Sequence, residues 1–208
     1  MSLAAFVRWS GLILFAGGVC LALFGLTFPI DSSGFPDNHN RGSQWVVSHS
    51  FHFVGATLIQ FGLFGIMARQ MRTFGTLDMV ALLVAFWGTL MFACLGIIAG
   101  YLSPLYPLLL SERDPLNSSP LGLVFPASGL LFIAGWILVA ISIVRAGALP
   151  RLTAVPIIVG VGPFALGFLV PWVVGAGAGV VFGAGLAWLG FAMWSGRQIA
   201  IETPARNG

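Results

Sequence analysis

Long apolar stretches separated by short polar connections fill almost the whole chain. A helix needs roughly 20 apolar residues to cross about 30 Å of hydrocarbon. Stretches near this length occupy residues 9–28, 45–68, 77–101, 121–144, 152–170 and 175–194. The pattern therefore predicts an all-α fold, with residues 1–208 forming a single polytopic membrane domain, a bundle of six transmembrane helices.

The polar connections contain residues that end helices. Pro29 closes the first stretch, because proline cannot continue the backbone hydrogen-bond ladder. Residues 31–44 read D-S-S-G-F-P-D-N-H-N-R-G-S-Q, a composition typical of turns. Within residues 152–170, Pro156 and Pro163 predict a helix that is kinked or locally broken.

Composition supports the same fold class. Hydrophobic residues make up 58% of the chain and charged residues only 7%, whereas soluble domains carry about 25% charged residues. We therefore expect the lipid bilayer to be the main partner of the surface. The net charge is +3, but the arginines are scattered singly over the connections. Topology explains them better than a nucleic-acid partner does, so we expect no nucleic acid binding.

The arginines also predict the orientation of the bundle. With six helices and the N-terminus in the cytoplasm, seven arginines lie on the inner side: Arg8, Arg69, Arg72, Arg145, Arg151, Arg197 and Arg206. Only Arg41 and Arg113 lie outside. Cytoplasmic loops of membrane proteins carry such an excess of positive charge. We therefore predict cytoplasmic N- and C-termini in a multi-pass protein of a cell membrane, such as the bacterial plasma membrane. The first stretch has no small-residue cleavage site, so we expect a retained helix.

Two of the three histidines open the second apolar stretch. His49 and His52 lie three residues apart and so share a helix face. Trp45 precedes them by about one turn, and Gln60 returns to nearly the same azimuth at 100° per residue. Because polar side chains are costly against lipid, this stripe should face the bundle interior. We expect an outward-opening polar pocket there, a ligand-binding site.

Two residues of the preceding loop, Asp37 and His39, join the candidate set, because the predicted topology puts them on the same outer side. The histidines could instead be structural, hydrogen-bonded to loop groups such as Asp31 or Asp37. Zinc ligation by His39, Asp37 and the two helical histidines is conceivable. Haem or another pigment is disfavoured, because bis-histidine sites usually draw one ligand from each of two facing helices. The sequence requires no cofactor, and the cofactor stays unknown.

Small residues form a stripe on the last apolar stretch, at Gly175, Gly179, Gly183 and Ala187. Such spacing lets another helix approach closely, within the bundle or between subunits. Gly55, Gly62 and Gly65 offer a second small-residue face on the stretch over residues 45–68. These faces predict tight helix packing and leave association with other membrane subunits, or self-association, as further partners.

No catalytic motif stands out, and we assign no catalytic residues. Glycine-rich phosphate loops, nucleophile elbows and H-E-x-x-H are absent from the sequence. We therefore expect a non-catalytic integral membrane protein, either a subunit of a membrane complex or a small-ligand-binding bundle. The alternatives are a transporter or channel for a small solute and a histidine-dependent redox or metal-binding membrane protein.

Overall fold

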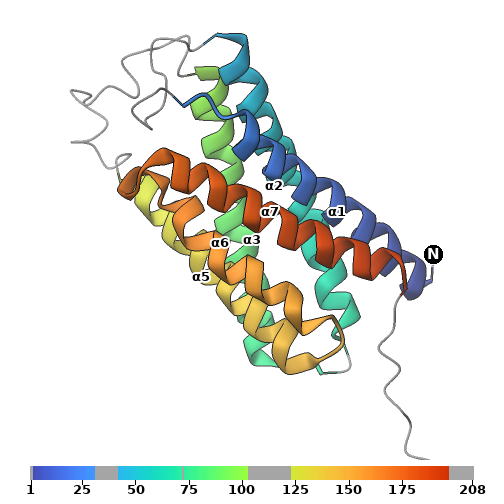
Figure 1. Cartoon of the computed structure of the whole chain (residues 1–208). Coiled ribbons are helices and arrows are strands. Elements are labelled where there is room, and N and C mark those ends of the chain that lie inside the picture. Colours follow the sequence, from blue (N-terminus) through green and yellow to red (C-terminus); the bar gives the residue numbers. More distant parts are fainter. Residues whose placement is uncertain (1, 31–41, 72, 103–122, 197–208) are drawn as a thin grey trace, which may run out of the picture.

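The computed structural model describes residues 2–30, 42–71, 73–102 and 123–196. Within these residues the fold is helical (Figure 1), with the main helices α1 (Leu3–Thr27), α2 (Ser43–Arg69), α3 (Thr76–Ile97), α5 (Val124–Ala146), α6 (Ala154–Ala165) and α7 (Trp172–Trp194). A π-helical turn, η1 (Ile98–Leu102), extends α3, and 3₁₀ turns η5 (Arg151–Thr153) and η6 (Gly167–Leu169) flank α6.

Five of these helices are long and apolar enough to cross a membrane: Leu3–Thr27, Ser43–Arg69, Thr76–Leu102, Pro126–Ala146 and Trp172–Trp194. This confirms an all-helical, multi-pass type of membrane protein. The sixth apolar helix, Arg151–Ala165, is shorter. At 1.5 Å per residue it measures about 22 Å, less than the roughly 30 Å of a hydrocarbon core.

The predicted helix over residues 152–170 is therefore too long. Pro156 lies in the first turn of α6, where a missing N–H costs little. Pro163 lies inside the helix near its end and removes one backbone donor. The α-helix stops two residues later at Ala165, and the chain continues as η6. The predicted local break thus occurs near the end of the helix, after Pro163, where the α-helix gives way to a 3₁₀ turn.

The helices form a closed ring in chain order. Each packs against its neighbours in sequence, and α7 packs against α1. Neighbouring helices run antiparallel, so the N-terminus and the end of α7 lie at the same end of the bundle (Figure 1). The chain thus passes along the bundle an even number of times in the described part.

The seam between α1 and α7 consists of glycines in register. Gly11, Gly18 and Gly25 of α1 recur every seven residues and lie against Gly190, Gly183 and Ala176 of α7. A Cβ on Gly18 would lie 2.5 Å from the Gly183 oxygen, and one on Gly183 would lie 2.5 Å from the Gly18 oxygen. The two backbones are therefore in direct contact.

The predicted small-residue stripe on α7 serves two seams instead of one. Gly183 and Ala187 face α1, because a Cβ on Gly18 would lie 2.4 Å from the Ala187 nitrogen. Gly179 faces α6, where a Cβ would lie 2.9 Å from the Phe164 ring. Gly175 approaches the segment after α6, with a Cβ position 3.1 Å from the Gly167 Cα. The glycine face of α2 packs against α1, through Gly55, Gly62 and Gly65.

One ring from each helix fills the centre of the bundle. We call these six side chains the central ring cluster: Phe24, His52, Phe92, Phe132, Phe164 and Phe182. Their centroids are separated by 4.3 Å for Phe92 and Phe132, 4.5 Å for His52 and Phe92, and 4.9 Å for Phe24 and His52. Because every helix contributes, the cluster ties the whole ring of helices together.

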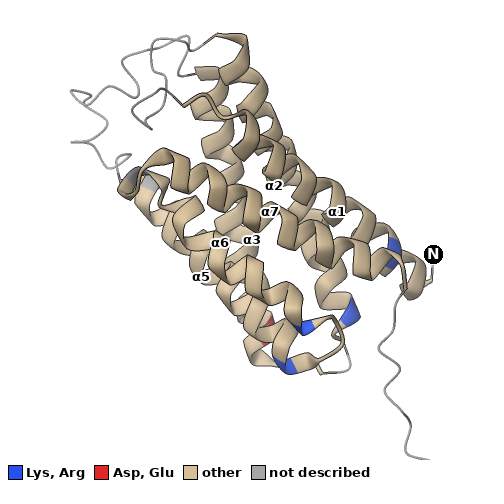
Figure 2. Cartoon of the chain, in the orientation of Figure 1, with Lys and Arg blue, Asp and Glu red and all other residues tan. Residues whose placement is uncertain are grey.

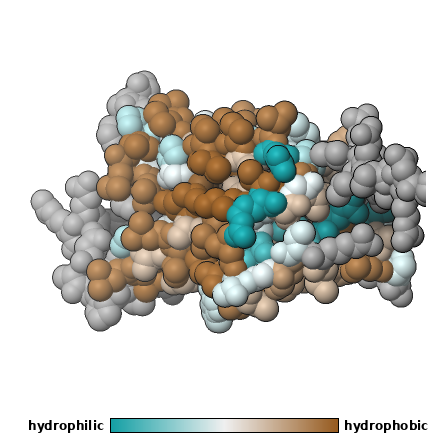
Figure 3. All heavy atoms as spheres, turned by 90° about the horizontal axis from the view of Figure 1, so that it is seen from below, coloured by the Kyte–Doolittle hydropathy of each residue, from teal (hydrophilic) through white to brown (hydrophobic). Residues whose placement is uncertain are grey.

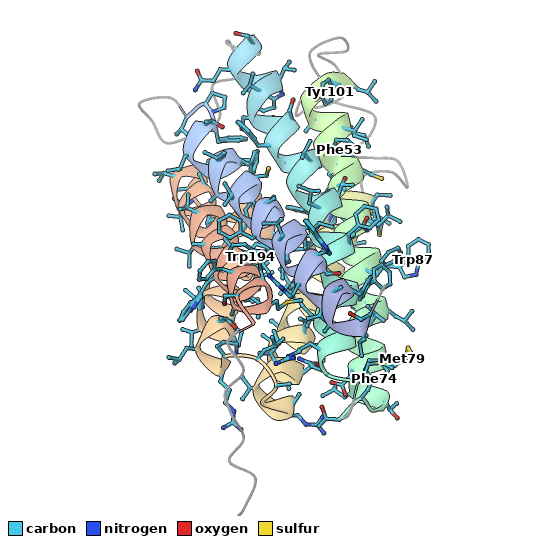
Figure 4. The ribbon with its side chains drawn as sticks, turned by 90° about the vertical axis from the view of Figure 1, so that its right-hand side faces the viewer. Phe53, Phe74, Met79, Trp87, Tyr101 and Trp194 are labelled. Atoms are coloured by element: carbon cyan, nitrogen blue, oxygen red, sulfur yellow. The ribbon has the colours of Figure 1, made fainter. Side chains whose placement is uncertain are left out.

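The described charged residues all lie toward one end of the bundle. Figure 2 shows the blue and red segments at the end of the bundle where the N-terminus lies. The charged residues of the described part are Arg8, Arg69, Asp78, Arg145 and Arg151. Figure 3 shows a mainly hydrophobic surface with hydrophilic residues gathered on one part of it. Between the ends, large apolar side chains point outward, such as Trp87, which is 57% exposed (Figure 4). This surface suits lipid contact.

Candidate functional site

The polar stripe of α2 lies in the bundle interior. Trp45, His49 and His52 are buried, each about 5% exposed or less. Gln60 is half-buried, and its Nε2 donates a hydrogen bond to the Phe86 carbonyl at 3.2 Å. The structure therefore brings the three aromatic members together at one end of α2, whereas Gln60 lies further along α2 and contacts the backbone of α3. The loop candidates, Asp37 and His39, lie outside the described residues.

The tautomer of His49 follows from its partner. Its Nδ1 lies 2.9 Å from the Trp45 carbonyl oxygen. A carbonyl can only accept, so Nδ1 carries the hydrogen in the neutral ring and Nε2 presents a lone pair. The Trp45 indole Nε1 donates in turn to the Ala99 carbonyl at 2.7 Å. Ala99 lies in η1, the last turn of its helix, where carbonyls lack intrahelical partners.

His52 is enclosed by aromatic rings. Phe24 and Phe92 lie 4.9 and 4.5 Å from it, centroid to centroid. Its Nε2 is buried without a hydrogen-bond partner among the described residues. Leaving such a group unpaired costs about 1–3 kcal/mol. At this end of the bundle, His52 is therefore the described residue with a buried side-chain atom that lacks a hydrogen-bond partner.

Two glycines of the third helix let α3 and η1 lie directly against the histidines. A Cβ on Gly96 would lie 3.1 Å from His52 Nδ1, and one on Gly100 would lie 2.4 Å from His49 Cβ. Sequence reasoning missed this pair. The sequence does contain a signal for it. Gly96 and Gly100 are two small residues four positions apart, at the end of one apolar stretch, and the histidines open another.

Beside the histidines lies a small recess between α1, η6 and α7. Its lining residues are Phe24, Phe28, Phe164, Gly167, Trp172, Gly175 and Ala176, and its volume is about 20 Å³. Phe28 and Trp172 stack in parallel, with centroids 5.2 Å apart and planes at 4°. No polar side chain belongs to this lining. Apart from Gly175, which was expected only to pack helices, sequence reasoning selected none of these residues.

Two rings separate the recess from His52. Phe24 belongs both to the recess lining and to the shell of His52. Phe164 also lines the recess, and its centroid lies 6.4 Å from that of His52. The recess and the His52 ring thus share two aromatic neighbours, Phe24 and Phe164.

The geometry does not fit a bis-histidine haem. His49 and His52 project from one face of α2, and Phe24 and Phe92 occupy the space around His52 with centroids 4.9 and 4.5 Å away, which leaves no room for a porphyrin between the two imidazoles. Three or more metal-ligating side chains do not meet anywhere in the described part of the chain. The four-residue zinc set needs Asp37 and His39, on which the described residues give no information.

A second buried polar cluster joins three helices at the arginine-bearing end. Asp78 accepts from the Gly75 backbone N–H at 2.7 Å, capping α3. Ser142 of α5 contacts Asp78 Oδ1 and, at 2.7 Å, an atom of the Gln70 side-chain amide. One hydroxyl hydrogen cannot serve two acceptors. We therefore orient the Gln70 amide so that Nε2 donates to Ser142, which donates to Asp78; amide orientation is set by such partners.

No protein-family model, curated protein or solved structure matches this chain. Function therefore rests on the geometry of the site. That geometry offers an apolar recess, two buried imidazoles and one imidazole nitrogen without a partner among the described residues.

Proposed function

We propose that this chain is a non-catalytic integral membrane protein that binds a small, mainly apolar ligand at the outer ends of α1, α2, α6 and α7. The observation that carries the proposal is the apolar recess beside the buried pair His49 and His52. Pockets for small molecules are typically apolar with a few convergent polar groups and hold about 300–1,000 Å³, so this recess of about 20 Å³ takes such a ligand only when its lining side chains move apart. In this proposal the bundle has six transmembrane helices in a plasma membrane of the bacterial type, and both termini lie in the cytoplasm.

The distribution of charge supports this orientation. Four described arginines lie at the end of the bundle opposite the recess, and the recess end carries no charged residue within the described part. Positive residues favour the cytoplasmic side. The recess and both histidines then open toward the outer face.

The short α6, fifth of the main helices in chain order, completes the set of six spans. It packs between α5 and α7 and runs antiparallel to both. A hydrophobic segment shorter than the bilayer is accommodated by local thinning of the lipid at modest cost. The turn η6 extends its reach toward the outer side.

The character of the recess supports an apolar ligand. Water in the cavity would find no polar side chain in the lining, although a buried water needs about 2–4 polar partners. The surrounding bilayer supplies apolar molecules at high local concentration. A transporter or channel is less well supported, because the central ring cluster fills the middle of the bundle with rings from every helix.

The test is to identify what the full-length protein retains when it is purified in mild detergent. Mass spectrometry of the extracted small molecules should find a stoichiometric apolar compound in the wild type. Gly175→Val should reduce its occupancy, because Gly175 lines the recess and a Cβ there already approaches Gly167 to 3.1 Å. Gly177→Val is the matched control, since nothing lies within 4 Å of its Cβ position.

Two results would contradict the proposal. The first is a preparation free of any retained apolar molecule, together with no gain in stability from added lipophilic compounds. The second is equal retention in the Gly175→Val and Gly177→Val variants. A stoichiometric second protein in place of a small molecule would favour a subunit of a membrane complex.

A further inference from the structure

Two arginines stand at either end of the short turn between α5 and α6. Arg145 lies in the last turn of α5, and Arg151 is the first residue of η5, directly before α6. Gly147 closes α5 with a φ of 63°, a left-handed conformation that favours glycine. The guanidinium of Arg151 folds back over this turn, because a Cβ on Gly147 would lie 3.3 Å from its Nη2. The positive charge of Arg151 is thus held beside the end of the helix that carries Arg145.

Nothing in the described part of the chain neutralises these two charges. Both arginines are exposed, and neither side chain forms an ion pair or a hydrogen bond with another described residue. The only acidic residue of the described part, Asp78, is buried and accepts from the Gly75 N–H and the Ser142 hydroxyl instead. Guanidinium groups bind phosphate with paired N–H donors. The turn therefore presents two groups of the kind that recognise a phosphate.

Exposed apolar side chains continue from each arginine toward the middle of the bundle. They lie one and four positions away along the chain: Val144 and Ile141 before the first arginine, and Leu152 and Val155 after the second. Because α5 ends at this turn and α6 begins just after it, both pairs lie deeper along the bundle than the arginines. The surface around the turn is therefore amphipathic, with positive charge at the end of the bundle and apolar side chains next to it.

We propose that the turn between α5 and α6 binds an anionic glycerophospholipid, such as phosphatidylglycerol. Arg145 and Arg151 hold the lipid phosphate, and the acyl chains lie along the exposed apolar residues that continue from them. A soluble phosphate would use only the two charges, whereas a lipid uses the charges and the apolar surface together. Basic residues at the end of membrane helices attract anionic lipids in this way. The site lies at the end of the bundle opposite the recess and does not depend on the ligand proposed there.

Native mass spectrometry of the full-length protein compares phosphatidylglycerol with phosphatidylcholine of the same acyl chains. The wild type should bind the first phosphatidylglycerol about tenfold more tightly, because each arginine near a membrane surface contributes about fivefold. The double variant Arg145→Gln and Arg151→Gln should lose this preference. The matched control, Arg8→Gln and Arg69→Gln, removes the same charge from α1 and α2, which α3 and α7 separate from α5 and α6 in the ring. This control should keep the preference.

A wild type that binds both lipids equally would overturn the site, and so would an equal loss of preference in the two double variants. Two measurements on the wild type do not depend on how a variant folds. Raising ammonium acetate from about 50 mM to about 500 mM screens exposed charges and should lower the preference, so a preference that ignores salt would contradict the arginine contacts. Excess glycerol 3-phosphate, which lacks acyl chains, should leave the lipid bound. Its displacement of the lipid would show a site for soluble phosphate instead.

Discussion

Gly183 is the position where the packing of this bundle can be tested most sharply. It lies in the seam between α1 and α7, and an added Cβ would lie 2.5 Å from the Gly18 oxygen and 2.6 Å from the Ala22 nitrogen. Ordinary contact begins at 3.4 Å, so the helices must separate by about 0.9 Å at this point. The opposing atoms belong to the backbone of α1, and no side-chain rotation can relieve the overlap.

The expected cost follows from that separation. A radial gap of about 0.5–1 Å already forfeits a quarter to a half of the contact energy at each atom pair. The same movement loosens the neighbouring contacts Gly11–Gly190 and Gly25–Ala176. Helix propensity returns up to about 1 kcal/mol for a glycine-to-alanine change. With overpacking worth about 1–3 kcal/mol per site, we expect Gly183→Ala to destabilise the fold by about 2 kcal/mol.

Reversible unfolding in mixed micelles of mild detergent and dodecyl sulfate measures this free energy. Gly177→Ala, on the same helix with nothing within 4 Å of its Cβ position, is the matched control and should be neutral or slightly stabilising. Equal unfolding free energies for the two variants would refute the direct backbone contact between α1 and α7.

Two hydrogen-bond predictions use the same unfolding titration. The Trp136 indole N–H donates a hydrogen bond to the Thr89 hydroxyl at 3.0 Å, and both residues are fully buried. Thr89→Val removes the acceptor and should lower the free energy of unfolding by about 1–3 kcal/mol. Thr89→Ser should recover most of this loss, and a valine variant as stable as the wild type would contradict the hydrogen bond. Ser142→Ala should cost about 1–3 kcal/mol by removing the hydroxyl that bridges Asp78 to α2. The destabilisation caused by Ser142→Ala should be smaller when Asp78→Asn is already present. If the unfolding free-energy losses of the two single variants simply add in the double variant, the Ser142 hydroxyl does not bridge to Asp78.

Hydropathy alone predicts the five long helices, because each is a nearly unbroken apolar run of membrane length. It also predicts the inward face of α2, since His49 and His52 are polar residues that lipid would not tolerate. The length of α6 escapes this reasoning. Its apolar residues continue past Ala165, and only the structure shows that the α-helix ends there after Pro163.

The recess could not be predicted from the sequence for a different reason. Phe24, Phe164 and Trp172 come from distant parts of the chain, and each looks like an ordinary apolar residue in its own helix. Their meeting depends on the order and register of the helices in the ring. The α1 glycines are an intermediate case, because the seven-residue spacing of Gly11 and Gly18 is visible, but the helix that they face is not.

The central claim is that the recess opens on the outer side of a six-span bundle, and cysteine accessibility in intact cells tests it most directly. Single cysteines replace Pro171, beside the recess, and Ala148, in the turn between α5 and α6, in a background where Cys20 and Cys94 are changed to alanine. A membrane-impermeant maleimide should label Pro171→Cys in intact cells and Ala148→Cys only after permeabilisation. Labelling of both positions from the same side would show that α6 does not cross the membrane, and the reversed pattern would place the recess in the cytoplasm.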